Sequence, residues 1–404
     1  MLHALLLASG IVSAQPLTLA ESAPVETTLD HPDIPDAQAI WLEMIHEAQT
    51  QIDLSQFYVA PKDQGDPETS RLKPVMEALD EAAARGVSIR FIIDAKFAKT
   101  YPKTLDALAK RFMVEVRKLD LTHHTGGVQH AKYFLVDGTT AWLGSQNFDW
   151  RSLEHITELG VRIDHPDLVA DLQAVFELDW ALAGGAANII EAGASTAPQV
   201  ERQGPPSTLT HNGAEVQARL VASPRAMLPD GVDWDLPHLI QGIDSARHRV
   251  RVQVMSYTLK GYDKQYWDEL DRALRRAAAR DVEVQFIVAD WSMSSSKQDY
   301  LKSLQVMPHL EVRVISIPQF SEYFVNFGRV VHAKYMVVDS RWSWVGTSNW
   351  SRDYFHGSRN VGIVVDGKSF AAPLDDWFLR MWNSEYATTI DPTKSYKAPK
   401  RTSK

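Results

Sequence analysis

Hydrophobic and polar positions follow one order of segments along the chain, and that order occurs twice. Apolar runs typical of buried strands cover residues 52–59 and 250–257. An amphipathic helix is expected after each run, and in the second half its apolar face consists of Tyr266, Trp267, Leu270, Leu274 and Ala277. A β-branched strand, a further helix and another strand follow. This alternation predicts an α/β fold made of two α/β-sandwich halves.

The two halves can be aligned residue by residue. Residues 130–149 read HAKYFLVDGTTAWLGSQNFD and residues 332–351 read HAKYMVVDSRWSWVGTSNWS, at a constant offset of 202. Upstream, residues 85–94 match residues 280–289 at an offset of 195. The chain is therefore a duplicated unit. We expect the halves to be related by a pseudo-twofold axis and to share one composite active site.

Five parts are expected along the chain. An apolar run at residues 1–14 is too short to span a bilayer and resembles a signal peptide, although no positive side chain precedes it. The halves cover residues 36–180 and 214–386, and a linker rich in Gly, Ala, Pro and Ser covers residues 181–213. A basic tail covers residues 387–404, and its end from Asp391 to Lys404 is expected to be frayed and solvated.

The N-terminal run predicts an exported protein, periplasmic or secreted, with a cytoplasmic protein as the alternative. No other segment is apolar and long enough to suggest a transmembrane helix.

The composition of the chain excludes several classes of functional site. The net charge of −9 provides no global basic field, so a polyanion would have to be held by a local pocket. The absence of cysteine excludes disulfides, thiolate zinc sites, iron–sulfur clusters and cysteine nucleophiles. His123 and His124 resemble a metal-binding pair only superficially and are expected in a loop rather than at a metal. We expect neither a metal nor a cofactor.

Each repeat offers a histidine, a lysine two residues later and an asparagine seventeen residues after the histidine. In a strand, positions i and i+2 share a face, so a histidine and its lysine can point at one ligand. Lysine suits a phosphate oxygen, and carboxamides add neutral donors. One imidazole could attack phosphorus while the other protonates the leaving oxygen. The candidate site residues are His130, Lys132, Asn147, His332, Lys334 and Asn349.

Two other features of the repeat can be explained by structural roles as well as by functional ones. Asp137 and Asp339 each end an apolar strand, which favours a turn-capping role over catalysis. The second half has six extra residues before its histidine, and this region is rich in aromatic residues. These aromatics could stack on nucleic-acid bases, enter lipid or pack as core beneath the loop, and they are Phe320, Tyr323, Phe324 and Phe327.

The repeated motif, H-x-K-x(4)-D followed by G-[ST]-x-N, resembles the double signature of the phospholipase D superfamily from about residue 36 to residue 386. The flanks at 144–153 and 346–355 resemble the phospholipase D three and four branch, which includes animal lysosomal proteins and poxvirus envelope relatives. The resemblance implies metal-independent catalysis through a phosphohistidine. His130 is then the nucleophile, and His332 is the general acid and later the base.

The same resemblance implies roles for the remaining motif residues. The lysines and asparagines, Lys132, Lys334, Asn147 and Asn349, would hold the non-bridging oxygens, and the aspartates would be structural. Glu158 stands where the family often has a carboxylate that orients a catalytic histidine, and the matching residue of the second half is Asn360. Glu158 could stabilise an imidazolium, or only pair with Arg162 on an exposed strand, whereas Asn360 could orient a ring without stabilising its charge. The sequence does not indicate which histidine each one contacts.

The substrate is the least determined feature. The superfamily includes phospholipases, cardiolipin synthases, nucleases and DNA-repair phosphodiesterases, and the resembling branch trims single-stranded nucleic acid from the 5′ end and acts on lysosomal lipids. The negative charge disfavours nucleic acid, and export would bring the protein to a membrane surface. We therefore favour, narrowly, phospholipid hydrolysis or headgroup exchange. A 5′ exonuclease on single-stranded nucleic acid is the alternative, an inactive envelope or binding protein is a minor one, and no required protein partner is evident.

Overall fold

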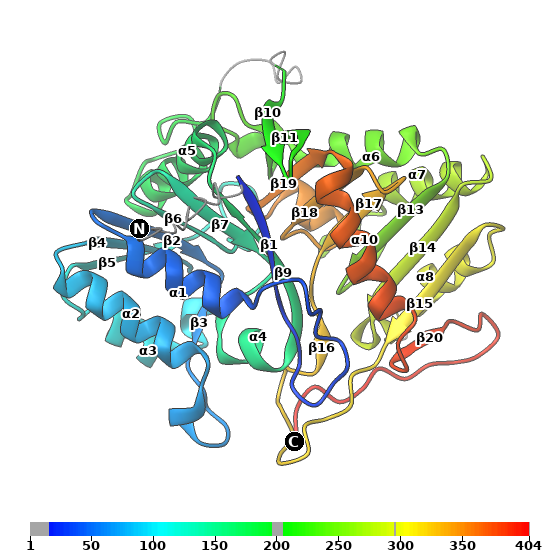
Figure 1. Ribbon diagram of the computed structural model, residues 1–404, viewed down its shortest axis with the longest axis horizontal. Coiled ribbons are helices and arrows are strands. Elements are labelled where there is room, and N and C mark those ends of the chain that lie inside the picture. Colours follow the sequence, from blue (N-terminus) through cyan, green and yellow to red (C-terminus); the bar gives the residue numbers. More distant parts are fainter. Residues whose placement is uncertain (1–15, 196–204, 295, 404) are drawn as a thin grey trace, which may run out of the picture.

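The computed structural model of the chain describes residues 16–195, 205–294 and 296–403, and the expected signal peptide at 1–14 lies outside them. Two mixed sheets stand side by side, one in each half of the chain (Figure 1). No helix among the described residues is both long enough and apolar enough to cross a membrane.

The first sheet has the strand order β1-β9-β7-β6-β2-β4-β5. Its strands are β1 (Leu17–Ser22), β9 (Ile156–Ile163), β7 (Thr140–Gly144), β6 (Tyr133–Val136), β2 (Gln51–Gln56), β4 (Ser88–Asp94) and β5 (Val114–Leu119). A separate short pair consists of β3 (Val59–Ala60) and β8 (Phe148–Asp149). The helices of this half are α1 (Ala37–Glu47), α2 (Leu72–Ala84), α3 (Pro102–Leu108), α4 (Trp150–Glu154) and α5 (Pro166–Ala183).

The second sheet repeats this order as β11-β19-β18-β17-β13-β14-β15, with β10 and β20 added at its two ends. Its strands are β10 (Ser207–His211), β11 (Ala214–Ser223), β19 (Asn360–Asp366), β18 (Trp342–Gly346), β17 (Tyr335–Val338), β13 (Arg249–Val254), β14 (Glu283–Ala289), β15 (Leu310–Ile315) and β20 (Ala387–Thr389). Two short strands are β12 (Asp233–Trp234) and β16 (Val330–Val331). The helices are α6 (Asp235–Ser245), α7 (Glu269–Ala278), α8 (Gln298–Gln305), α9 (Arg352–His356) and α10 (Lys368–Trp382).

The matching strand orders confirm the predicted pair of homologous α/β halves. In each half the first three strands after the leading helix are parallel, β2-β4-β5 and β13-β14-β15, and the strands after the histidine return antiparallel. Parallel strands end at one edge, so the loops after β2, β4, β13 and β14 gather at a common edge of their sheets.

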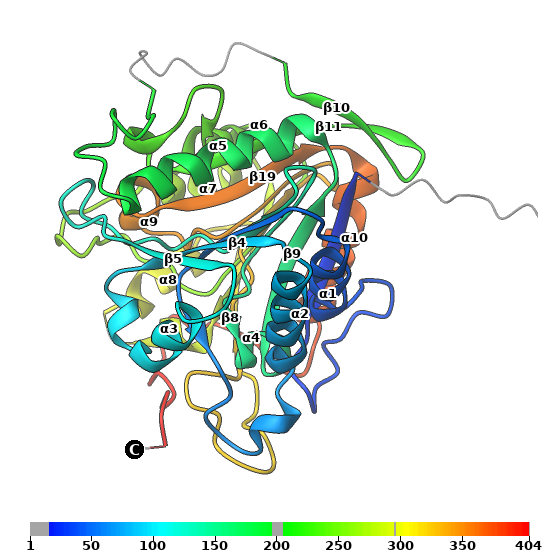
Figure 2. The ribbon, with the colours of Figure 1, turned by 90° about the vertical axis from the view of Figure 1, so that its left-hand side faces the viewer.

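Three hydrophobic clusters give the molecule its layers. In the first half, α1 and α2 cover one face of the sheet and α5 covers the other (Figure 2). The second half places α6, α7 and α8 on its outer face and α10 on its inner face. The inner faces of both sheets share one buried cluster with α5 and α10. This common core fixes the position of one half relative to the other.

Polar contacts cross the boundary between the halves at its centre. Strand β16 of the second half pairs in parallel with β9 of the first. The Arg359 guanidinium, at the start of β19, bonds both carboxylate oxygens of Asp179 in α5, and both side chains are fully buried. A buried ion pair is sensitive to loss of one partner, because the remaining charge stays out of water.

Regular structure extends beyond several predicted bounds. Strand β1 lies upstream of residue 36 and pairs with β9, while α5 and β10 enter the two ends of the interval 181–213. The prediction that Tyr266 and Trp267 lie in a helix is wrong, because both precede α7 and instead pair with the segment at Leu259 and Lys260. Trp267 is buried as expected, whereas Tyr266 is largely exposed.

The C-terminal tail is docked, so the prediction of a frayed end is wrong. Strand β20 pairs antiparallel with β15, and the buried Ile390 donates its N–H to the carbonyl of Val312 at 3.0 Å. The phenol of Tyr396 accepts from the Asp391 N–H at 2.7 Å, and Gln298 Nε2 donates to its carbonyl. Strand pairing with the edge of β15 and the packing of Ile390 and Tyr396 against the core hold the tail on the sheet despite its polar composition.

The buried ion pair leads to a stability prediction. Replacing Arg359 by Met should lower the free energy of unfolding by about 3–5 kcal/mol, because the Asp179 carboxylate is left buried and unpaired. Urea unfolding followed by circular dichroism measures the loss. The exposed pair of Arg341 with Asp366, at 2.6 Å, provides the control, and Arg341→Ala should cost less than about 1 kcal/mol. Equal losses in the two variants would contradict this account of the boundary.

Candidate active site

Both motif histidines lie in extended segments that lead into β6 and β17, rather than within those strands. The reason is that each segment pairs with the opposite half. The backbone N–H of His130 donates to the carbonyl of Arg359 at 3.0 Å, and that of His332 donates to Thr157 at 2.9 Å. Each histidine is therefore attached to the half of the chain that does not contain it.

The hydrogen bonds of Asn360 determine the tautomer of His130. The amide Nδ2 donates to the carbonyls of Tyr354 and Ser358, at 2.8 and 3.3 Å. Its Oδ1 accepts from Thr347 Oγ1 at 2.9 Å and lies 3.0 Å from His130 Nδ1. A carboxamide oxygen only accepts, so His130 Nδ1 carries the hydrogen and Nε2 keeps its lone pair.

The other histidine is paired with a carboxylate. His332 Nδ1 lies 2.8 and 3.0 Å from the two oxygens of Glu158, which is fully buried. The alternative interpretation, an exposed pair of Glu158 with Arg162, is wrong, because Arg162 binds Glu43, Glu47 and Asp164 instead. The two halves thus exchange partners, since Glu158 belongs to the first half and Asn360 to the second.

The number of protons that the Glu158–His332 pair holds follows from the burial of both groups. Burial raises the pKa of the Glu158 carboxyl to about 8, against the attraction of Lys334. Burial also lowers the pKa of His332 well below its usual value, and Lys334 and Lys132 act in the same direction. Below about pH 8 the pair therefore holds two protons, as carboxyl with imidazole or as carboxylate with imidazolium. Either arrangement leaves a hydrogen on His332 Nε2.

The two motif lysines lie beside the histidines and are fully buried. Lys132 and Lys334 donate through Nζ to the carbonyls of His130 and His332, respectively. Burial lowers the pKa of Lys132 well below its usual value and that of Lys334 to about 7. Burial lowers the pKa of His130 as well, and repulsion from both lysines adds to it. Four basic groups thus lie close together, with Glu158 as the carboxylate bound directly to one of them, an arrangement that an anionic ligand would stabilise.

The asparagines and aspartates of the motif separate into two groups. Asn147 lines the cavity beside the histidines, and Asn349 Oδ1 accepts from the Ser256 N–H at 3.1 Å, which leaves its amide hydrogens for another acceptor. Asp137 and Asp339 do not line the cavity. Each carboxylate instead accepts three backbone N–H groups at 2.7–2.9 Å, from Gln49, Thr50 and Gln51 or from Arg247, His248 and Arg249.

A cavity of about 860 Å³ opens over the two histidines, and both halves contribute to its walls. The ring of His130 packs against Phe57 and Tyr354, with ring centroids 5.0 and 4.9 Å apart. The cavity is strongly aromatic, and its lining includes Phe57, Tyr58, Phe97, Tyr101, Tyr262, Trp291, Phe327 and Tyr354. Its cationic side chains are Lys96, Arg151, Arg352 and Arg401.

Sequence reasoning missed most of these lining residues, although a signal for some of them is present. Phe57, Phe97 and Trp291 lie within three residues of the ends of β2, β4 and β14, where ligands of parallel sheets commonly bind. The aromatic residues of the loop before His332 have different environments. Phe320 and Tyr323 pack on the core of the first half, whereas Phe327 is half exposed and lines the cavity.

Possible metal ligands do not gather in the described part of the chain. No group of three or more His, Asp or Glu side chains there has an arrangement that could hold a metal ion. His123 and His124 lie in the turn that follows β5, as expected.

Comparisons with known proteins identify the family of this chain. Residues 41–180 and 239–382 match the model of the family described as "Cardiolipin synthase, PLD-like domain". The chain is 31% identical over 391 residues to "Phospholipase D Z" of Dictyostelium discoideum, covering 93% of this chain and 90% of that protein. It is 31% identical over 401 residues to "5'-3' exonuclease PLD3" of Macaca fascicularis, covering 92% and 80%. The phosphatidylserine synthase structure from Haemophilus influenzae has the same fold, with a TM-score of 0.59 and 11% identity over 87% and 85% of the chains.

Proposed function

The chain belongs to the PLD-like domain family and is a phosphodiesterase of the phospholipase D superfamily, and on that premise we propose that it cleaves single-stranded nucleic acid through a phosphohistidine intermediate. The observation that carries the mechanism is the unequal partnering of the two histidines. Asn360 holds His130 with a free Nε2 lone pair, and Glu158 holds His332 with a hydrogen on Nε2.

In the first step, His130 Nε2 attacks phosphorus and the bond from phosphorus to the leaving oxygen breaks. His332 Nε2 gives its hydrogen to that oxygen, and the Glu158–His332 pair is left with one proton. The imidazole of His130 becomes a cationic phosphohistidine. Because Asn360 is neutral, it orients the ring without stabilising that cation, so the intermediate remains a good phosphoryl donor.

In the second step, a water molecule replaces the leaving group. His332 Nε2, now with a lone pair, takes a proton from the water as its oxygen attacks phosphorus. The bond to His130 breaks, a phosphomonoester leaves, and the Glu158–His332 pair regains its second proton. Lys132, Lys334, Asn147 and Asn349 supply the donors for the non-bridging oxygens, as the family motif implies. Neither step uses a metal ion.

The lining of the cavity supports a nucleic-acid substrate over the phospholipid that the sequence narrowly favours. Bases stack on aromatic side chains without sequence preference, and cations along the same groove hold the backbone. Both kinds of group surround the histidines from both halves. Two of these cations, Lys96 and Arg401, form no ion pair within the described ranges, and their local charge answers part of the objection raised by the overall charge of −9. The PLD3 relative is named as an exonuclease.

Phospholipid remains the second candidate, on one observation. Phe327 and Tyr262 are exposed at the cavity, where apolar surface could contact a lipid layer. The relative from Dictyostelium discoideum is named as a phospholipase.

The substrate assignment is tested with three substrates in parallel. Purified protein is incubated with bis-p-nitrophenyl phosphate, with 5′-hydroxyl single-stranded DNA, and with phosphatidylglycerol or phosphatidylcholine vesicles plus ethanol. We expect p-nitrophenol and nucleotide release, both unchanged in EDTA, and no phosphatidylethanol. His130→Ala should lower both activities by several orders of magnitude and serves as the control for contaminating enzymes.

Two results would overturn parts of this proposal. Phosphatidylethanol without nucleotide release would establish the lipid substrate instead. Loss of all activity in EDTA, restored by zinc or magnesium, would refute the metal-independent mechanism.

The Glu158–His332 pair predicts a pH dependence. The general acid needs the second proton of the pair, which is lost as the pH rises through the pKa of about 8. Accordingly, kcat for single-stranded DNA should fall above about pH 8, whereas kcat/KM should begin to fall above about pH 7, because the free protein also loses the charge of Lys334. In Glu158→Gln, His332 alone must carry the acid proton, and its burial lowers its pKa. The falling limb should therefore move to lower pH by about one unit or more.

A matched substitution controls for the change in net charge. Glu177→Gln removes the same charge from an exposed residue that pairs with Arg90, away from the cavity. Its profile should coincide with that of the unmodified protein. An unchanged profile in Glu158→Gln would show that the carboxylate does not maintain the acid proton.

A further inference from the structure

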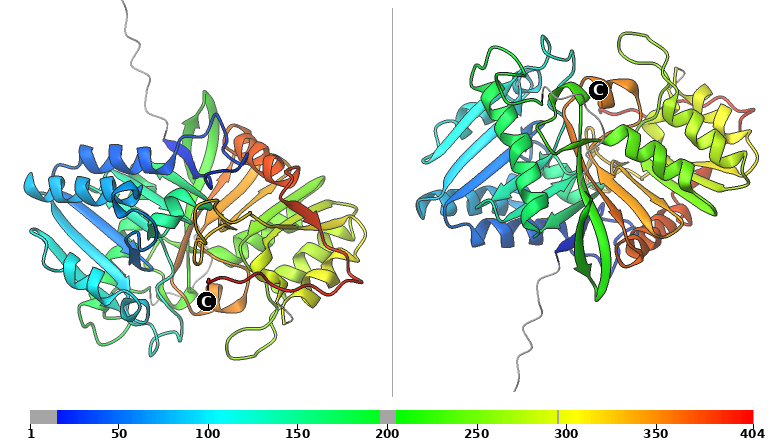
Figure 3. Two further views of the ribbon diagram at one scale, coloured as in Figure 1. Left: turned by 90° about the horizontal axis from the view of Figure 1, so that it is seen from below. Right: turned by 90° about the horizontal axis from the view of Figure 1, so that it is seen from above.

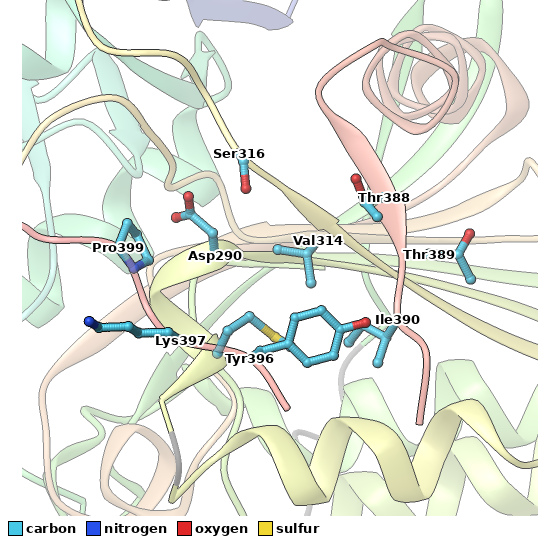
Figure 4. A pocket seen from close by; sticks show the side chains of 10 residues that line it. Asp290, Val314, Ser316, Thr388, Thr389, Ile390, Tyr396, Lys397 and Pro399 are labelled. Atoms are coloured by element: carbon cyan, nitrogen blue, oxygen red, sulfur yellow. The ribbon is translucent and has the colours of Figure 1, made fainter. Parts of the chain in front are cut away.

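The docked tail runs from the second sheet to the boundary between the halves. Its end lies near that boundary in Figure 1 and in both views of Figure 3. On the way the tail borders a hollow of about 260 Å³, whose lining includes Tyr396, Lys397 and Pro399 of the tail together with Asp290 and Val314 (Figure 4). The tail is thus held along its length before it reaches the active-site cavity.

Arg401 is the tail residue that enters the wall of that cavity. Its guanidinium carbon lies 4.7 Å from the centre of the Trp291 ring, and Nη2 donates to the Trp291 carbonyl at 3.4 Å. The carbonyl of Arg401 accepts from the Phe327 N–H at 2.8 Å, and Ser403 N–H donates to Asn326 Oδ1 at 2.8 Å. The tail and the aromatic loop therefore form one continuous wall, and stacking leaves the edge of the guanidinium free to donate.

The cations of the cavity differ in their partners. Arg151 is bound to Asp149 at 2.6 Å and Arg352 to Asp263 at 3.1 Å, so their charges are compensated. Arg401 and Lys96 are exposed, and neither forms an ion pair with any residue in the described ranges. These two side chains are the ones with charge available for a substrate.

The repeat relates the positions of these two cations. Lys96 and Trp291 occupy matching positions, each two residues after the matched segments that end at residues 94 and 289. The first half thus carries a cation in its own loop. The second half carries an aromatic platform at that position, and the tail adds a cation on top of it. Each half of the shared cavity therefore has one exposed cation that forms no ion pair within the described ranges, although Asp290 lies near enough to Arg401, and Asp94 to Lys96, to interact electrostatically.

We propose that Arg401, stacked on Trp291, binds a non-scissile phosphate of the nucleotide chain while the neighbouring phosphodiester lies between the histidines. This inference rests on the proposed nucleic-acid substrate. The C-terminal tail is then part of the substrate site. Arg401 determines preference for a polynucleotide over a substrate with a single phosphate, and it takes no part in the reaction at phosphorus.

Two substrates distinguish binding of a non-scissile phosphate by Arg401 from a role in catalysis. Thymidine 3′-(4-nitrophenyl phosphate) has only the scissile phosphate, whereas a 5′-hydroxyl oligothymidylate has several. Arg401→Gln should raise KM for the oligonucleotide by about tenfold, with kcat nearly unchanged and the single-phosphate substrate unaffected. The slope of log KM against log salt should fall by about one. Lys400→Gln, an exposed neighbour that does not line the cavity, should change neither substrate.

The outcomes distinguish failure of the inference from failure of the proposed function. If the unmodified protein cleaves the oligonucleotide but Arg401→Gln changes neither KM nor the salt slope, Arg401 does not bind substrate. Equal losses on both substrates would also overturn the inference, because they indicate a structural role. If the unmodified protein does not cleave the oligonucleotide, the nucleic-acid function fails and this inference fails with it. Weaker binding of Arg401→Gln to phosphatidylglycerol vesicles, with oligonucleotide cleavage unchanged, would assign the residue to a lipid surface.

Discussion

The active site depends on an exchange of contacts between the two halves of the chain. Each motif histidine donates its backbone N–H to the opposite half, and the ring nitrogen Nδ1 of each lies beside a side chain of the opposite half. The strand pairing of β16 with β9 and the buried Arg359–Asp179 ion pair lie at the same boundary. Displacement of one half relative to the other would therefore remove both ring partners at once. The shared core beneath the site prevents that displacement.

Within this symmetric frame, one difference separates the roles of the histidines. Glu158 and Asn360 occupy matching positions in β9 and β19, but one can gain or lose a proton and the other cannot. In the proposed mechanism, Asn360 keeps a neutral imidazole in the tautomer that a nucleophile requires. Glu158 in turn stores the proton that the general acid gives and later recovers. On this proposal, the exchange of a carboxylate for a carboxamide at equivalent positions gives the two halves different functions.

The sequence predicted the duplication, the α/β halves and the family, because the repeated motif is long and its register is constant. It did not indicate that Glu158 would contact His332 rather than His130, since that depends on packing between distant segments. The docked tail was missed for a similar reason. Ile390 and Tyr396 stand among basic and polar residues, so they form no apolar pattern that would predict docking. The edge of β15 that pairs with β20 exists only once the sheet is assembled. The aromatic lining was also missed, because Phe57, Phe97 and Trp291 come together only at the ends of separate strands.

The most direct test of the central claim is to trap the intermediate on the assigned histidine. Thymidine 3′-(4-nitrophenyl phosphate) has a leaving group that needs no protonation, so a His332→Ala variant should still complete the first step and then stall. The account predicts a burst of p-nitrophenol stoichiometric with the enzyme, and an acid-labile nucleotide adduct on His130 in peptide mass spectrometry. Absence of the burst, or an adduct on a residue other than His130, would contradict it.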